Sequence, residues 1–167
     1  IFKPKFTFAS YYLKVGIIHN LMYGRFNQNS NMILRISDEK TLASVQADFN
    51  AYFPYLKVEF FKAPHKIGEG SMKSLLYDNS RHIRDCRVKH VEGELKIDDK
   101  MTVNELEDQF LEVYGLSVQV FRKSGNVWLE TSATDNWTLR QQNNEGAELS
   151  TQIKNDKAGD YNDRDVE

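Results

Sequence analysis

The chain has 167 residues, of which 40% are hydrophobic, and a formal net charge of -2 at pH 7. This length suits one domain with a single core. The near-neutral charge disfavours a dedicated nucleic-acid binder and a protein drawn to anionic membranes. Cys86 is the only cysteine, and no apolar run approaches about 20 residues, so we expect a soluble protein without disulfides, located in the cytoplasm.

Residues 1–31 differ in composition from the rest of the chain. They contain four basic and no acidic side chains, and their aromatic residues follow neither a helical nor a strand period. A signal peptide would need a cleaner apolar core and a small-residue cleavage site. We therefore interpret 1–31 as an extension outside the domain, translated from upstream of a true start at Met32.

A repeat with an offset of 61 residues begins at Met32. Its identities are Leu34 with Leu95, Ile36 with Ile97, Asp38 with Asp99, Thr41 with Thr102, and Phe49 with Phe110. Five identities alone are weak evidence, but the hydrophobic periodicity of the two copies also agrees. The sequence therefore predicts a duplicated strand-helix-strand unit.

The first copy predicts a strand, a helix and a strand in that order. Leu42, Val45, Phe49 and Tyr52 lie at the spacing of one helical face. Pro54 disfavours helical geometry at the residue before it and should end the helix. Apolar residues then alternate with others through Leu56, Val58 and Phe60, as in a strand.

Residues 63–92 form a long linker that holds the candidates for chemistry. The glycine-rich loop 66–74 lacks the Gly-Lys step of a phosphate-binding loop. His82, Cys86 and His90 would align as metal ligands only on a continuous helix, which the linker does not favour. Cys86 is also the one candidate nucleophile, although a buried thiol beside surface histidines is the simpler interpretation, and we expect no cofactor and no metal.

The second copy predicts a helix with a capping box formed by Thr102 and Glu105. Its apolar face is Val103, Leu106, Phe110 and Val113, and Gly115 ends it. Asp98 and Asp99 precede this helix, where negative charges interact favourably with the helix dipole. We therefore expect a structural role for them. A further strand, Val127–Thr131, should close a hairpin after a glycine-containing turn.

The segment 143–167 is too polar to offset the entropy of ordering and is expected to be disordered. The domain thus covers 32–142. Its α+β order resembles a ferredoxin-like plait, which implies an antiparallel sheet with both helices on one face plus an extra C-terminal strand. The alternative is a ubiquitin-like roll in the second half, with a hairpin near 87–97.

In the plait, one open sheet face would mix aromatic and cationic side chains. The expected members of this binding face are Arg35, Lys57, Phe61, Lys96, Gln119 and Phe121. Domains of the RNA-recognition type use a similar layout, but the strand 94–98 of this chain lacks their aromatic residue. Exposed aromatic residues more often mark association between proteins.

The stretch from Val118 to Thr131 resembles one in small bacterial proteins described as hypothetical, and this resemblance implies no activity. The sequence favours a non-catalytic protein-binding or regulatory module, with a protein partner or a homodimer formed through the open sheet face. Single-stranded nucleic-acid binding on the same face is the first alternative. An enzyme of unknown reaction around Cys86, His82 and His90 is the second.

Overall fold

A computed structural model describes residues 31–63 and 73–159, with side-chain environments up to residue 151. The chain divides into two units, and only the second, Asn31–Glu167, contains described residues. Apart from Asn31, the expected extension 1–31 lies outside the described residues, so its interpretation stays a prediction. Most of the glycine-rich loop also lies outside them.

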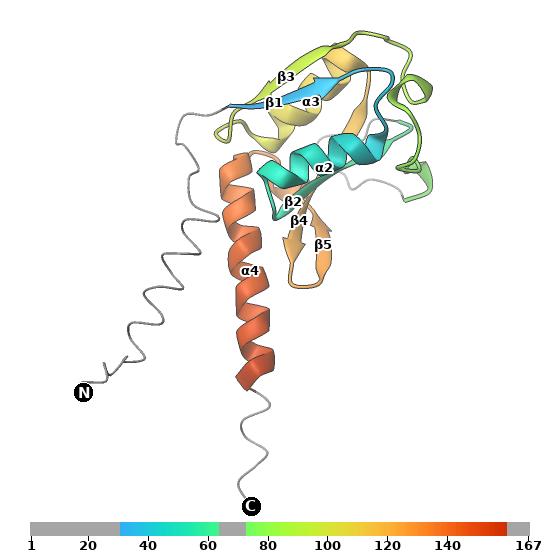
Figure 1. The fold of residues 1–167 in the computed structure, drawn as a ribbon. Coiled ribbons are helices and arrows are strands. Elements are labelled where there is room, and N and C mark those ends of the chain that lie inside the picture. Colours follow the sequence, from blue (N-terminus) through green and yellow to red (C-terminus); the bar gives the residue numbers. More distant parts are fainter. Residues whose placement is uncertain (1–30, 64–72, 160–167) are drawn as a thin grey trace, which may run out of the picture. The chain divides into compact units, whose positions relative to one another are not determined.

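Five strands among the described residues form two separate antiparallel sheets (Figure 1). One sheet pairs β1 (Met32–Ile36) with β3 (Gly93–Ile97). The other has the order β2-β4-β5, with β2 at Leu56–Phe61, β4 at Ser117–Ser124 and β5 at Val127–Glu130. The α+β class agrees with the prediction, but the strands do not form the single sheet of a ferredoxin-like plait.

The two edges of β2 explain why the sheets are separate. In a plait β2 would pair with β3, but here β4 pairs along its full length. On the other edge, Gln46 Nε2 donates to the Val58 carbonyl and Asn50 Nδ2 donates to the Leu56 carbonyl, both at 2.8 Å. Side chains of the first helix therefore occupy backbone acceptors that β3 would use. The hairpin that the ubiquitin-like alternative needs near 87–97 is also not observed, because β3 pairs only with β1 among the described residues.

Both predicted helices are present, α2 at Leu42–Tyr52 and α3 at Val103–Tyr114. The predicted capping box is confirmed, since the Thr102 side chain accepts from the Glu105 amide and the Glu105 carboxylate accepts from the Thr102 amide. Gly115 ends α3 with a φ of 64°, a left-handed conformation that glycine adopts without steric cost. The local signals in the sequence thus set these helix ends.

The two helices contribute matched side chains to one hydrophobic core. The core residues at corresponding helical positions are Leu42, Val45 and Phe49 on α2, and Val103, Leu106 and Phe110 on α3. The prediction was wrong for Val113, which is 45% exposed, while Tyr114 is buried. The buried face of α3 continues from Phe110 to Tyr114, four residues later, and not to Val113, three residues later. Both spacings are compatible with one helical face.

The N-terminal turns of α2 and α3 are closed by corresponding backbone hydrogen bonds. The amides of Leu42 and Val103 donate to the carbonyls of Arg81 and Trp137 at 2.9 and 3.1 Å. The neighbouring amides, those of Ala43 and Asn104, donate to the carbonyls of Asn79 and Asp135. We call 79–84 and 135–140 the return segments, because each folds back onto the start of its helix.

The second return segment leads into a long helix, α4 (Leu139–Gly159). Residues 143–159, expected in a disordered tail, are therefore helical, and 160–167 lie outside the described residues. The helix starts against the body, where Arg140 forms a two-point ion pair with Asp99 at 2.6 and 2.7 Å. Asp99 thus has the structural role expected for it. Among the described residues, none of the helices combines the length and apolar character required to cross a membrane.

The contact between α4 and the β2-β4-β5 sheet is close and largely polar. Asn143 Oδ1 accepts from the Tyr55 amide at 3.0 Å, and Gln142 Oε1 accepts from Arg122 Nη1 at 2.8 Å. Gly146 is the next buried position of α4. The helix therefore approaches the sheet at a residue without a side chain.

We expect Gly146→Ala to destabilise the protein, although alanine is the better helix former by about 1 kcal/mol. A Cβ at this position would lie 2.8 Å from Tyr55 Cβ and 3.1 Å from the Tyr55 carbonyl oxygen, so a helix or strand has to move. Overpacking of this kind costs about 1–3 kcal/mol. Chemical denaturation measures the change. Asn144→Ala, at an exposed position two residues earlier, is the control and should be neutral or slightly stabilising.

Candidate protein-binding surface

The six predicted binding residues lie on two different sheets. Arg35 and Lys96 are exposed on the β1–β3 pair, where Arg35 lies opposite Glu94. The other four lie on β2 and β4, and the separation of the sheets therefore divides the expected face. Arg35 and Lys96 belong to a surface of their own.

Two of the remaining four residues are buried. Phe61 is 5% exposed, and its backbone forms an isolated bridge with Leu76 of the linker. Gln119 is fully buried, and its Nε2 donates to Glu107 Oε1 of α3 at 3.1 Å. Neither side chain is accessible to a partner in this conformation, whereas Lys57 and Phe121 remain partly exposed.

Lys57 and Phe121 are directly opposite in the β2–β4 register and are in contact. The Lys57 ammonium lies 5.1 Å from the centre of the Phe121 ring and 5.3 Å from the centre of the Trp128 ring. It also forms an ion pair with Glu59 at 2.6 Å. A lysine ammonium within about 6 Å of two ring centres is stabilised by a cation–π interaction with each ring.

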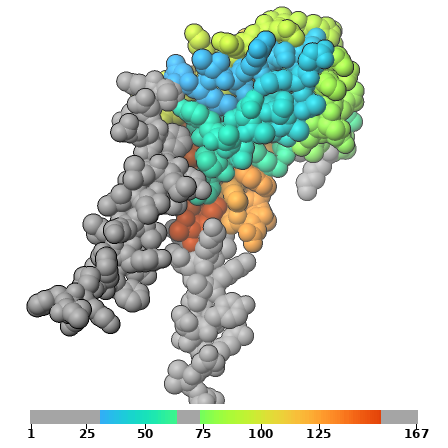
Figure 2. All heavy atoms as spheres, viewed as in Figure 1, coloured from blue at the N-terminus to red at the C-terminus, as the bar shows by residue number. Residues whose placement is uncertain are grey.

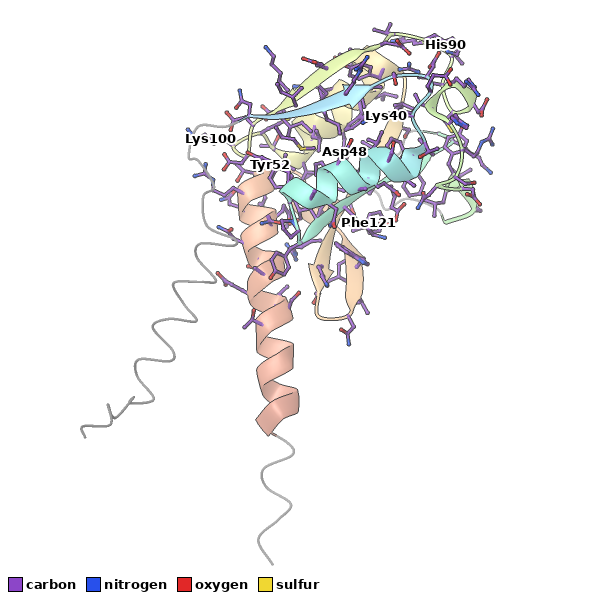
Figure 3. The ribbon with its side chains drawn as sticks, in the orientation of Figure 1. Lys40, Asp48, Tyr52, His90, Lys100 and Phe121 are labelled. Atoms are coloured by element: carbon purple, nitrogen blue, oxygen red, sulfur yellow. The ribbon has the colours of Figure 1, made fainter. Side chains whose placement is uncertain are left out.

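A second lysine extends this arrangement onto the hairpin. Lys123 lies opposite Trp128 in the β4–β5 register, and its ammonium is 6.0 Å from the centre of the Trp128 ring. Within the described part of the chain, Lys123 forms no salt bridge. We call Lys57, Phe121, Lys123 and Trp128 the cation–aromatic surface. Figure 3 shows Phe121 at the β4–β5 hairpin, well away from His90.

The binding face expected from the sequence included neither Trp128 nor Lys123. The signal that identifies both is the two-residue turn at Gly125 and Asn126. A two-residue turn fixes the register of a hairpin, and this register puts Trp128 on the same sheet face as Phe121. The two added members of the surface follow from that register.

Cys86, His82 and His90 of the linker are the residues of the enzyme alternative. Cys86 is buried, and burial raises the pKa of its thiol despite the nearby charge of Arg81. Such a thiol is less nucleophilic at neutral pH. Among the described residues, which omit His65, no group of three histidine, cysteine or acidic side chains is placed to hold a metal ion.

His90 instead belongs to an ion-pair cluster around Asp38. The fully buried Arg87 side chain donates from Nε and Nη2 to Asp38 Oδ1 at 3.0 and 2.7 Å. His90 Nδ1 lies 2.8 Å from the second oxygen, Oδ2. The hydrogen bond from Arg87 is the main reason that the pKa of Asp38 is lowered. This cluster ties the end of the linker to β1 and has a structural role.

Comparison of the chain with protein-family models, with curated proteins and with solved structures gives no match. A proposal for its function therefore rests on the geometry of the described residues.

Proposed function

We propose that the chain is a non-catalytic binding module and that a protein partner docks on the cation–aromatic surface. The observation that carries the proposal is the position of the Lys57 ammonium, 5.1 and 5.3 Å from the ring centres of Phe121 and Trp128, on a sheet face that is partly exposed. Aromatic side chains are enriched where proteins associate, because they offer a large apolar area. A partner with carboxylate and apolar side chains fits this chemistry.

Single-stranded nucleic acid is the second candidate, because two lysines beside aromatic rings suit stacking of bases next to phosphates. Two features oppose it. Glu59 neutralises Lys57, and the whole chain carries a net charge of -2. A protein partner therefore fits the charge of this surface better.

We also propose that the two halves descend from one duplicated unit. Corresponding hydrogen bonds close the starts of α2 and α3, and Leu34 lies opposite Leu95, its counterpart in the repeat, in the β1–β3 register. A local two-fold relation between the halves would produce both features. The duplicated unit then contains a strand, a helix, a strand and a return segment.

Two variants test the binding surface. Phe121→Ser removes one ring, and Lys123→Glu reverses the charge beside Trp128. We expect each to weaken capture of a protein partner at least about tenfold, since central aromatic residues of interfaces contribute about 2 kcal/mol or more. Affinity capture from native extract, followed by titration of the purified partner, measures the change. The matched control is Val113→Ala, which removes an exposed apolar side chain from α3.

Binding of a fluorescent oligothymidylate tests the nucleic-acid alternative. If the surface binds proteins, we expect the chain not to bind this oligonucleotide at low salt. Tight binding that weakens steeply with salt would favour the nucleic-acid alternative. Unchanged partner capture by both Phe121→Ser and Lys123→Glu would remove this surface from consideration.

A further inference from the structure

The outer edge of β5 offers backbone groups to a further strand. β5 pairs with β4 on one side, and no other described strand pairs with it. The Thr131 amide donates to the Val120 carbonyl, so it points toward β4, while the Lys123 amide donates to Tyr55 and points away from β5. Because amides alternate along a strand, those of Trp128 and Glu130 point outward from the sheet.

The side chains of this edge strand are unusually apolar for an open edge. Val127 and Leu129 project from the same sheet face and are 56% and 44% exposed. Natural edge strands are commonly protected by charged side chains, proline or a bulge, and in β5 the one charged side chain is Glu130, at its C-terminal end. Figure 2 shows the hairpin, in orange, at the molecular surface. An open edge with exposed apolar side chains is a template for strand pairing.

We propose that this edge pairs antiparallel with β5 of a second copy of the chain, with the two-fold axis at Leu129. In this register Leu129 meets its counterpart at the axis, and Trp128 lies opposite Glu130 of the second copy. The outward amides and carbonyls of these two positions then form four hydrogen bonds across the interface. The two three-stranded sheets become one sheet of six strands.

Charge complementarity favours a second copy as the occupant. Lys123 lies behind Trp128 in the same row across the sheet. The proposed register brings Glu130 of the second copy to the other side of the Trp128 ring, about 10 Å or two strand spacings from Lys123. The two-fold axis repeats this row, so each copy offers a lysine toward the glutamate of the other. Side chains of equal sign do not meet directly along the edge.

This inference goes beyond the proposed function, because it uses the backbone edge of β5 and Leu129, which lies on the face opposite the cation–aromatic surface. It shares with that surface only the row through Trp128 and Lys123. Leu129 belongs only to the edge, whereas Phe121 belongs only to the surface. Loss of dimers in a Leu129 variant and loss of partner binding in a Phe121 variant are therefore separate results.

The first test is the mass of the full chain in solution by light scattering over a dilution series. We expect dimers for the wild type and a dissociation constant raised at least about tenfold in Leu129→Lys, where two ammonium groups would meet at the axis. Val113→Lys, an exposed apolar position on α3, is the control and should leave the dimer unchanged. A wild-type chain that stays monomeric at all concentrations overturns the proposal.

The second test fixes the register. In a Cys86→Ala background, Leu129→Cys should form an intermolecular disulfide on mild oxidation, since residues of a non-hydrogen-bonded pair lie about 4.5 Å apart between Cα atoms. Val127→Cys is the matched variant, and its two thiols would be separated by about four residues along the strands, roughly 13 Å. Equal cross-linking of the two variants, or none at Leu129→Cys, overturns the proposed pairing.

Discussion

Phe110→Ala is expected to lower the free energy of unfolding by about 3–5 kcal/mol, the usual cost of removing a large aromatic side chain from a core. Phe110 is fully buried, and its ring meets Phe60 edge to face with centroids 6.1 Å apart. The substitution therefore leaves a cavity where α3 meets β2. Urea denaturation followed by circular dichroism measures the change.

The control for this prediction lies on the same helix. Val113→Ala removes an exposed side chain and should change stability by less than about 0.5 kcal/mol. Phe49, the counterpart of Phe110 in the repeat, is also fully buried, so Phe49→Ala should cost a similar amount. A cost below about 1 kcal/mol for Phe110→Ala would contradict the shared core of α2 and α3.

Asp38→Ala is expected to cause the second large loss of stability, with a melting temperature lower by several degrees. The variant leaves the buried Arg87 guanidinium with its hydrogen bond to the Val91 carbonyl but without a carboxylate. An unpaired buried charge is strongly destabilising. Asp48→Ala breaks a pair in which the aspartate is about half exposed, 2.6 Å from Lys40, and should have little effect. Equal melting temperatures for Asp38→Ala and Asp48→Ala would contradict the prediction.

The same carboxylate gives the stability a defined pH dependence. Arg87 holds the pKa of Asp38 below its usual value of 3.8, so the folded chain favours the ionised form. The stabilisation is complete above the unfolded pKa and is lost as pH falls through the lowered folded pKa. The difference in melting temperature between the wild type and Asp38→Ala should therefore be largest near neutral pH and shrink below about pH 4.

Local signals in the sequence were sufficient for α2 and α3 and for their ends. Spacing identified Val45 and Phe49, and the Thr102–Glu105 pair marked the start of α3. Strand pairing was not predictable in the same way, because alternation shows which side of a strand is apolar but not which strand lies beside it. The side chains of Gln46 and Asn50, polar residues on a helix, occupy the edge of β2 and change the sheet.

The tail was misjudged for a related reason. Composition predicted disorder after residue 142, since the segment has few apolar side chains. The first part of α4 docks through Asn143, Gln142 and the absent side chain of Gly146, none of which scores as hydrophobic. A helix that packs through polar contacts and close backbone approach is not detected by the periodicity of apolar residues.

The candidate site was only partly predictable. Lys57 and Phe121 were identified because residues on adjacent strands share a face at every second position. Phe61 is buried, and its backbone pairs with Leu76, which depends on the path of the linker and is encoded by no periodicity. Trp128 joined the surface through the register of a hairpin, a feature that depends on the turn rather than on the strand itself.

The return segments also affect the binding of anions at the starts of α2 and α3. Free amides at the first turn of a helix are a frequent binding place for phosphate and carboxylate groups. In this chain the amides of Leu42 and Ala43 donate to backbone carbonyls, and those of Val103 and Asn104 do the same. A phosphorylated ligand would therefore find these donors already engaged at α2 and α3, and would have to be recognised through side chains.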